Sequence, residues 1–165
     1  MSSEPEHSNC VSSPVTITVS SEYIVDTGVS DFKYTTSDED GNGGLFGCIH
    51  AVRGDTLTIH VVGNYADLVS HPIKITGYND QGQHMAPLTG VVKTDTGGQN
   101  NDGTYTLTWT VPDDTSVDKY QYQCENHAHM RGTIYVSETI LVSQGITTST
   151  NEDTPITITL SAIFQ

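Results

Sequence analysis

The stretch that decides the fold is Tyr-Gln-Tyr-Gln-Cys-Glu-Asn-His-Ala-His-Met-Arg-Gly-Thr-Ile-Tyr-Val, residues 120–136. Both of its ends alternate in the manner of strands, which leaves a short loop between them. That loop carries Cys124, His127 and Met130 in the pattern C-x2-H-x2-M. Thiolate, imidazole and thioether are soft ligands that suit copper, above all copper that must visit Cu(I). The stretch therefore predicts a copper loop between two paired strands.

Three ligands in one loop require a fourth from elsewhere, and the chain offers His71 in Val-Ser-His-Pro-Ile-Lys-Ile. Zinc is the chemical rival for such a site. Zinc proteins rarely recruit thioether sulfur and usually show more Cys or His. We therefore expect one copper ion per chain, cycling between Cu(II) and Cu(I).

This pattern resembles that of the cupredoxins, the small blue-copper fold, whose short-loop, amicyanin-like members have a similar loop length. In that family an early His precedes a C-x2-H-x(2–4)-M loop, which lies just before the last strand of a sandwich. The resemblance extends upstream to Arg53–Ile59, which is similar to the family's G-D-T strand entry, and to Trp109–Pro112 before the Cys strand. It covers roughly residues 14–137. The family's ligands map onto His71, Cys124, His127 and Met130.

The resemblance implies a type 1 copper site that transfers single electrons. Cys124 would supply the thiolate, His71 and His127 would complete a trigonal plane, and Met130 would give a long axial contact. The ring edge of His127 would then be the electron port. An apolar ring around it is expected from Met85, Ala86, Pro87, Leu88 and Ala128.

Two departures from the family pattern concern this site. Many members have Asn after the first His, whereas this chain has Pro72, which has no backbone N–H to donate. The ligand region is also crowded, because His129 adjoins Met130 and the pair His84–Met85 lies between the first ligand and the Cys. The identity of the axial ligand, Met130 or another residue, therefore stays open.

The composition predicts an all-β fold. Only 35% of residues are hydrophobic, Tyr (8) outnumbers Phe (3), and turn residues abound. Strands recurring every 8–12 residues favour an antiparallel Greek-key β-sandwich or flattened barrel. A short helix near residues 66–69 is the one helical candidate. The expected strands are 14–20, 22–26, 31–36, 45–50, 55–62, 72–76, 91–93, 104–111, 120–124 and 133–136.

The chain divides into a polar amino-terminal arm over residues 1–13, a cupredoxin-like domain over 14–137 and a carboxy-terminal β-strand extension over 138–165. In that extension, Pro155–Ser161 repeats Pro14–Ser20 position by position, with only Ile/Val and Leu/Val exchanges. Convergence explains the repeat, since alternating Thr and β-branched residues make any amphipathic strand. The alternative is that both segments pair with neighbouring subunits by β-addition, giving a homo-oligomer or a larger assembly.

The three cysteines indicate a compartment. If Cys124 is a ligand, Cys10 and Cys48 remain, and a disulfide between them requires an oxidising environment. The alternative is two unrelated reduced thiols. No secretory signal is visible at the amino terminus. We expect an extracytoplasmic location: periplasmic, secreted or within an extracellular or virion assembly.

Charge limits the partners. The formal net charge is −14, from 20 acidic and 6 basic side chains. That balance argues against nucleic acid, whose phosphates need Lys and Arg, and favours a basic redox partner protein. An acidic surface suited to a saline medium is the plainer interpretation. No apolar run reaches the roughly 18 residues of a membrane span.

The other motifs are weaker. Asp38–Gly43 fits the first half of a calcium loop, but its twelfth position is Ile49 rather than Glu, which disfavours calcium. The single H-x-H, His127 to His129, is too little for a multicopper oxidase. His50 and His60 lie in strand patterns and are expected to be structural.

We find no nucleophile–base constellation and no phosphate-binding glycine loop, so we expect no enzyme. Two further functions compete with electron transfer. One is a structural or adhesive β-module whose copper is stabilising. The other is copper sequestration or delivery.

Overall fold

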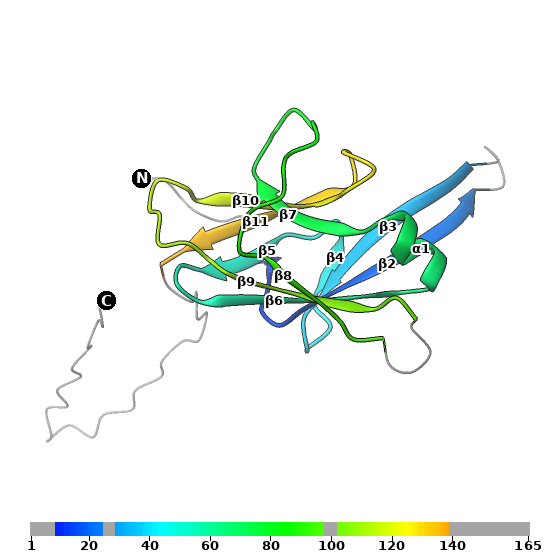
Figure 1. Ribbon diagram of the computed structural model, residues 1–165, viewed down its shortest axis with the longest axis horizontal. Helices are drawn as coiled ribbons and strands as arrows, with labels where there is room; N and C mark the ends of the chain where they lie inside the picture. Colours follow the sequence, from blue (N-terminus) through cyan, green and yellow to red (C-terminus); the bar gives the residue numbers. More distant parts are fainter. Residues whose placement is uncertain (1–8, 25–28, 98–101, 139–165) are drawn as a thin grey trace, which may run out of the picture.

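Two β-sheets stacked face to face form the structure, a computed structural model that describes residues 9–24, 29–97 and 102–138. In Figure 1 the strands β7, β10 and β11 lie over β6, β8 and β9. The five-stranded sheet has the order β1 (Val11–Ser12), β5 (Ile49–Val52), β11 (Arg131–Ser137), β10 (Lys119–Cys124) and β7 (Ile73–Gly77). The six-stranded sheet has the order β4 (Gly43–Leu45), β3 (Val29–Ser37), β2 (Val15–Ile24), β6 (Thr56–Gly63), β9 (Tyr105–Thr110) and β8 (Val92–Asp95).

The core lies between the sheets and follows the period of two. In β9, Tyr105, Leu107 and Trp109 are buried while the intervening threonines face outward, as the alternation predicted. The first copy of the repeated heptad behaves in the same way within β2, where its apolar members are buried. Those buried members are Val15, Ile17 and Val19.

The predicted all-β sandwich is confirmed, but its sheets are mixed rather than antiparallel. β5 runs parallel to β1 and β11, and β2 runs parallel to β6. The β1–β5 and β2–β6 pairs are parallel because the chain changes sheets twice in the same way, from β1 to β2 and from β5 to β6, so the two crossings lie side by side. In the described residues the sheets remain two layers and form no closed barrel.

Other expectations are met or shifted locally. The short helix exists as α1 (Tyr65–Ser70), and the weak strand predicted at 91–93 is the edge strand β8. Of the predicted arm, residues 9–13 are described, and Val11 is a buried member of β1, so packing begins before residue 14. The repeat at 155–161 and nearly all of the extension lie outside the described residues. No helix in the described part of the chain has the length and apolar character that crossing a membrane requires.

The register around β10 positions the loop ligands. β10 pairs antiparallel with β11 on one side and with β7 on the other. In the second pairing Cys124 lies opposite Ile73, which is two residues after His71. The last residue of β10 therefore meets the segment that carries the distant histidine.

The predicted disulfide between Cys10 and Cys48 is present. It holds β1 beside β5, where the Val11 amide also donates to the Cys48 carbonyl oxygen at 3.0 Å. An oxidising compartment is the environment in which such a bond persists.

Replacing both Cys10 and Cys48 by Ser should lower the free energy of unfolding. The bond closes a loop with a sequence separation of 38 residues, for which chain entropy gives about 4 kcal/mol. Urea unfolding of the metal-free protein measures the loss, and reducing the wild-type protein should reproduce it. Equal unfolding midpoints for wild type and double variant would contradict this role.

Candidate metal centre

His71, Cys124 and His127 meet at one point, with their ligand atoms all within 4.8 Å of one another. The Cys124 Sγ atom lies 3.8 Å from Nδ1 of His71 and 3.6 Å from Nδ1 of His127. Both imidazoles thus turn the same nitrogen toward the sulfur. Within the described residues this is the one such group of His, Cys, Asp and Glu side chains.

A short helix delivers His71. The Asn64 side chain caps α1 by accepting from the Asp67 amide at 2.9 Å, and the His71 amide closes the other end on the Asp67 carbonyl oxygen at 2.9 Å. Pro72 follows and cannot continue the helix. The chain therefore turns into β7 with His71 1% exposed at the turn.

The loop between β10 and β11 delivers the other candidates. It is closed by two backbone bonds, from the Met130 amide to the His127 carbonyl oxygen at 3.1 Å and from the Cys124 amide to the Met130 carbonyl oxygen at 2.9 Å. Cys124 and Met130 are buried, while His127 is half-buried. The loop thus presents a sulfur pair inward and one imidazole toward solvent.

Two further bonds attach this loop to the His71 segment. The Glu125 amide donates to the Pro72 carbonyl oxygen at 2.8 Å, and the Asn126 side-chain amide donates to the Ser70 carbonyl oxygen at 2.9 Å. One main-chain bond and one side-chain bond therefore hold the two ligand-bearing segments together.

The Cys124 sulfur receives one backbone donor. The Asn126 amide donates to Sγ at 3.4 Å. Pro72 has no amide hydrogen to add. The residue after His71 therefore gives the sulfur no backbone hydrogen bond.

The electrostatics keep His71 ready to bind a metal. Burial lowers the pKa of His71, and the nearby His127 lowers it further, while Asp67 acts in the opposite direction. The neutral imidazole is the form that ligates. The Nε2 atom of His71 is buried and has no hydrogen-bond partner in the described structure, and the Phe32 ring lies against the imidazole with centroids 3.9 Å apart.

The donor set fits copper. Two imidazole nitrogens and a buried cysteine sulfur converge, and a buried methionine lies in the same loop. No carboxylate belongs to the group. Soft sulfur with imidazole and without hard oxygen ligands is the chemistry that copper prefers among the common metals.

Other candidates from the sequence lie apart from this group. His129 is exposed, with its ring 6.0 Å from that of His127, and His84 is also exposed. Met85 is half-buried, and its sulfur accepts from the Asn79 side chain at 3.2 Å. The remaining members of the expected apolar ring are half-buried (Leu88, Ala128) or exposed (Ala86, Pro87).

The remaining histidines and the acidic loop have structural partners. His50 pairs with the Ser137 hydroxyl at 2.7 Å and His60 with the Thr106 hydroxyl at 3.0 Å, which confirms their structural role. In the Asp38–Gly43 loop, which fits the first half of a calcium loop, Asp38 accepts from the Asn42 side chain and from the backbone amides of residues 40 and 42. These bonds, that of the Asn42 side chain first, lower the pKa of Asp38 and close the loop on itself as a turn.

Gln123 is a site residue that sequence reasoning missed. It is buried on the outer face of β10, where its Oε1 accepts from the Met85 amide at 3.1 Å. Its Nε2 donates to the carbonyl oxygens of Gln83 and Ala128, both at 2.9 Å. One side chain thus joins the loop after β7 to the ligand loop. In the sequence, Gln123 is simply a polar residue on the outward face of a strand, and nothing there indicates that it joins two loops.

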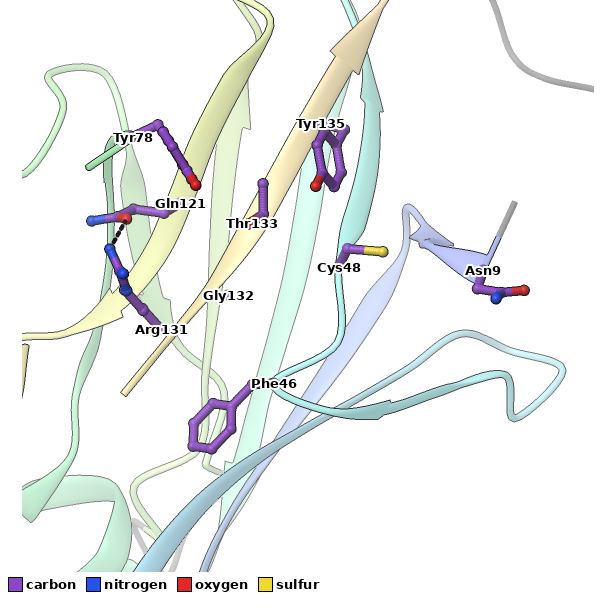
Figure 2. A pocket seen from close by; sticks show the side chains of 9 residues that line it. All are labelled: Asn9, Phe46, Cys48, Tyr78, Gln121, Arg131, Gly132, Thr133 and Tyr135. Carbon is purple, nitrogen blue, oxygen red and sulfur yellow. Dashed lines mark hydrogen bonds between the residues drawn. The ribbon is translucent and has the colours of Figure 1, made fainter. Parts of the chain in front are cut away.

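A hollow of about 480 Å³ lies on the outer face of the same sheet (Figure 2). Figure 2 shows Gln121 bonded to Arg131 at one side of it, with Nη1 to Oε1 at 3.5 Å. Arg131 also donates to the carbonyl oxygens of Asn79 and Asp80. Because Arg131 directly follows Met130, these bonds anchor the far end of the ligand loop.

Comparisons with known proteins give structural neighbours and nothing closer. The sequence matches no protein-family model and no curated protein. A structure of the copper protein rusticyanin is 14% identical, with 78% of each chain covered and a TM-score of 0.41. Rusticyanin from Thiobacillus ferrooxidans is 15% identical, again with 78% of each chain covered, at a TM-score of 0.40. A multicopper oxidase from Campylobacter jejuni is 18% identical over 83% of this chain and 28% of its own, at 0.41.

At this level of similarity the neighbours say nothing of function. The chain nevertheless resembles the cupredoxins on its own evidence. It forms a two-layer β-sandwich, and it brings the early His to the Cys and His of the last loop.

Replacing Gln123 by Leu should destabilise the protein by about 3 kcal/mol, because three hydrogen bonds to backbone groups are lost at about 1 kcal/mol each. Urea unfolding measures the loss, and hydrogen exchange should quicken at the Met85 amide. The control is Gln83→Ala, which leaves the Gln83 carbonyl oxygen in place and should change neither. A Gln123→Leu protein with the wild-type free energy of unfolding would show that these hydrogen bonds do not contribute to stability.

The lowered pKa of His71 predicts a pH dependence of the metal-free protein. Below the ordinary value of 6.5 the unfolded chain takes up a proton that folded His71 refuses. Stability should therefore fall as the pH drops below that value, by at most about 1.4 kcal/mol per pH unit from this group. In His71→Gln the slope between pH 7 and 5 should flatten, whereas in the exposed control His60→Gln it should not. Equal slopes in all three proteins would contradict the assignment.

Proposed function

We propose that the chain is a type 1 copper protein that transfers single electrons, with copper held by His71, Cys124, His127 and Met130. The observation that supports this most is the pair of Nδ1 atoms that lie near the buried sulfur, 3.8 Å and 3.6 Å away, with all three ligand atoms within 4.8 Å of one another. The buried thioether of Met130 is the proposed axial ligand, because it belongs to the same closed loop.

When bound, copper supplies a one-electron couple between Cu(II) and Cu(I). The protein's contribution is to hold the ligands still. The backbone bonds that close the ligand loop, together with the Glu125 amide bond to Pro72 and the Asn126 side-chain bond to Ser70, oppose any change of ligand position. A site that moves little between two oxidation states has a low barrier to electron transfer. The buried sulfurs also keep water from the metal position.

His127 is the proposed electron port, because it alone of the three gathered ligands is partly exposed. Met85 and Leu88 lie in the loop after β7, and Ala128 lies in the ligand loop, which Gln123 joins to it. These three half-buried side chains would surround His127 with an apolar rim. A net charge of −14 would attract a basic redox partner protein. Its association rate should fall as salt screens that attraction.

The disulfide favours an extracytoplasmic site of action. Sequestration is the second candidate and uses the same ligands. Oxidase chemistry is disfavoured, since His129 of the single H-x-H is exposed and apart from the gathered ligands.

Copper loading tests the proposal. The wild-type protein should become blue with one copper per chain, bleach with reductant and recover with oxidant. Cys124→Ser should lose the colour entirely, because the absorption needs the thiolate–copper bond, while the control His129→Gln should keep it. Met130→Leu should keep the colour and shift the reduction potential.

Reduction potential and Cu(I) affinity, measured together, separate transfer from storage. Reversible cycling of a stable site indicates electron transfer, whereas tight Cu(I) binding without reversible oxidation indicates sequestration. A colourless protein after copper loading would refute the proposed site.

A further inference from the structure

Two tyrosines cross the sandwich to reach the segment that carries His71. Tyr34 comes from β3 and Tyr105 from β9, both in the six-stranded sheet. The Tyr34 hydroxyl donates to the His71 carbonyl oxygen at 2.9 Å, and the Tyr105 hydroxyl accepts from the Ile73 amide at 2.8 Å. They therefore bind the main chain on either side of Pro72.

The segment between them has few other attachments. The His71 amide closes α1, and the Pro72 carbonyl oxygen accepts from the Glu125 amide at 2.8 Å. Ile73 begins β7. Pro72 itself contributes no donor, so the two hydroxyls supply bonds that the local backbone lacks.

Both hydroxyls are deeply buried and stay protonated. Burial raises the pKa of Tyr105 to about 12, while the hydrogen bond from the Ile73 amide acts in the opposite direction. Burial raises the pKa of Tyr34 as well. Both hydroxyls thus bond the main chain beside His71 from inside the core.

Resting on the proposed copper site, we infer that Tyr34 and Tyr105 are positioning residues that aim the His71 imidazole at the Cys124 sulfur. Neither would touch the metal. Each would act through the backbone of the His71–Ile73 segment, which it holds from the opposite sheet. The distance of 3.8 Å between Nδ1 and Sγ is the geometry that they maintain.

Tyr122 provides a matched control. It is also a buried tyrosine whose hydroxyl donates to a backbone carbonyl oxygen, that of Gly47 at 2.7 Å. Gly47 lies between β4 and β5 and belongs to no ligand segment. Loss of this hydroxyl should cost stability without turning His71.

The experiment compares Tyr34→Phe, Tyr105→Phe and Tyr122→Phe in the full chain. With copper, the dissociation constant should rise about 10- to 100-fold in the first two, the range typical of lost outer partners of a ligand. Their blue absorption band should shift. Tyr122→Phe should match the wild type in both readouts.

A second readout needs no metal. In the metal-free wild type, the close His71 and Phe32 rings should give nuclear Overhauser contacts by NMR. These contacts should weaken in Tyr34→Phe and Tyr105→Phe and persist in Tyr122→Phe. The inference is overturned if both variants keep these contacts at wild-type strength. A wild type that shows the contacts but never turns blue would instead refute the copper proposal and leave the positioning effect standing.

If either Tyr34→Phe or Tyr105→Phe fails to fold, the other variant still tests the inference, because each hydroxyl bonds a different backbone atom. Near-ultraviolet circular dichroism of the metal-free proteins identifies a folding failure.

Discussion

The pairing of β7 with β10 is the constraint on which the rest of the molecule depends. With Cys124 opposite Ile73, the end of one strand meets the start of the other, and residues 53 positions apart in sequence have side chains in contact. A shift by one residue would send the Cys124 side chain to the opposite face of the sheet. The bonds that join the ligand loop to the His71 segment, from Glu125 to Pro72 and from Asn126 to Ser70, continue that register beyond the strand ends.

The local part of the site could be predicted from sequence because its information is local. Cys124, His127 and Met130 lie within seven residues, and the alternation on either side fixes the strands that hold them. The burial of Tyr105, Leu107 and Trp109 on one face of β9 follows from the same period of two. His71 could be predicted only from its residue type and from its place before the Cys in the sequence. Nothing in the neighbouring residues indicates which strand lies beside it in the fold.

The sequence could not indicate which side-chain hydrogen bonds join the loops and the two sheets. Gln123 looks like any outward strand residue, yet three backbone groups from two loops depend on it. Tyr34 and Tyr105 look like core aromatics, and their hydroxyl bonds appear only when the second sheet is in place. The parallel pairs were missed for the same reason, because strand direction depends on where the chain changes sheets.

X-ray absorption at the copper edge of the copper-loaded protein tests the central claim most directly. The account predicts one short sulfur scatterer and two imidazole nitrogens in both oxidation states, with nearly unchanged distances, and loss of one imidazole in His71→Gly. A spectrum with nitrogen and oxygen neighbours only, or an unchanged spectrum in His71→Gly, would contradict it.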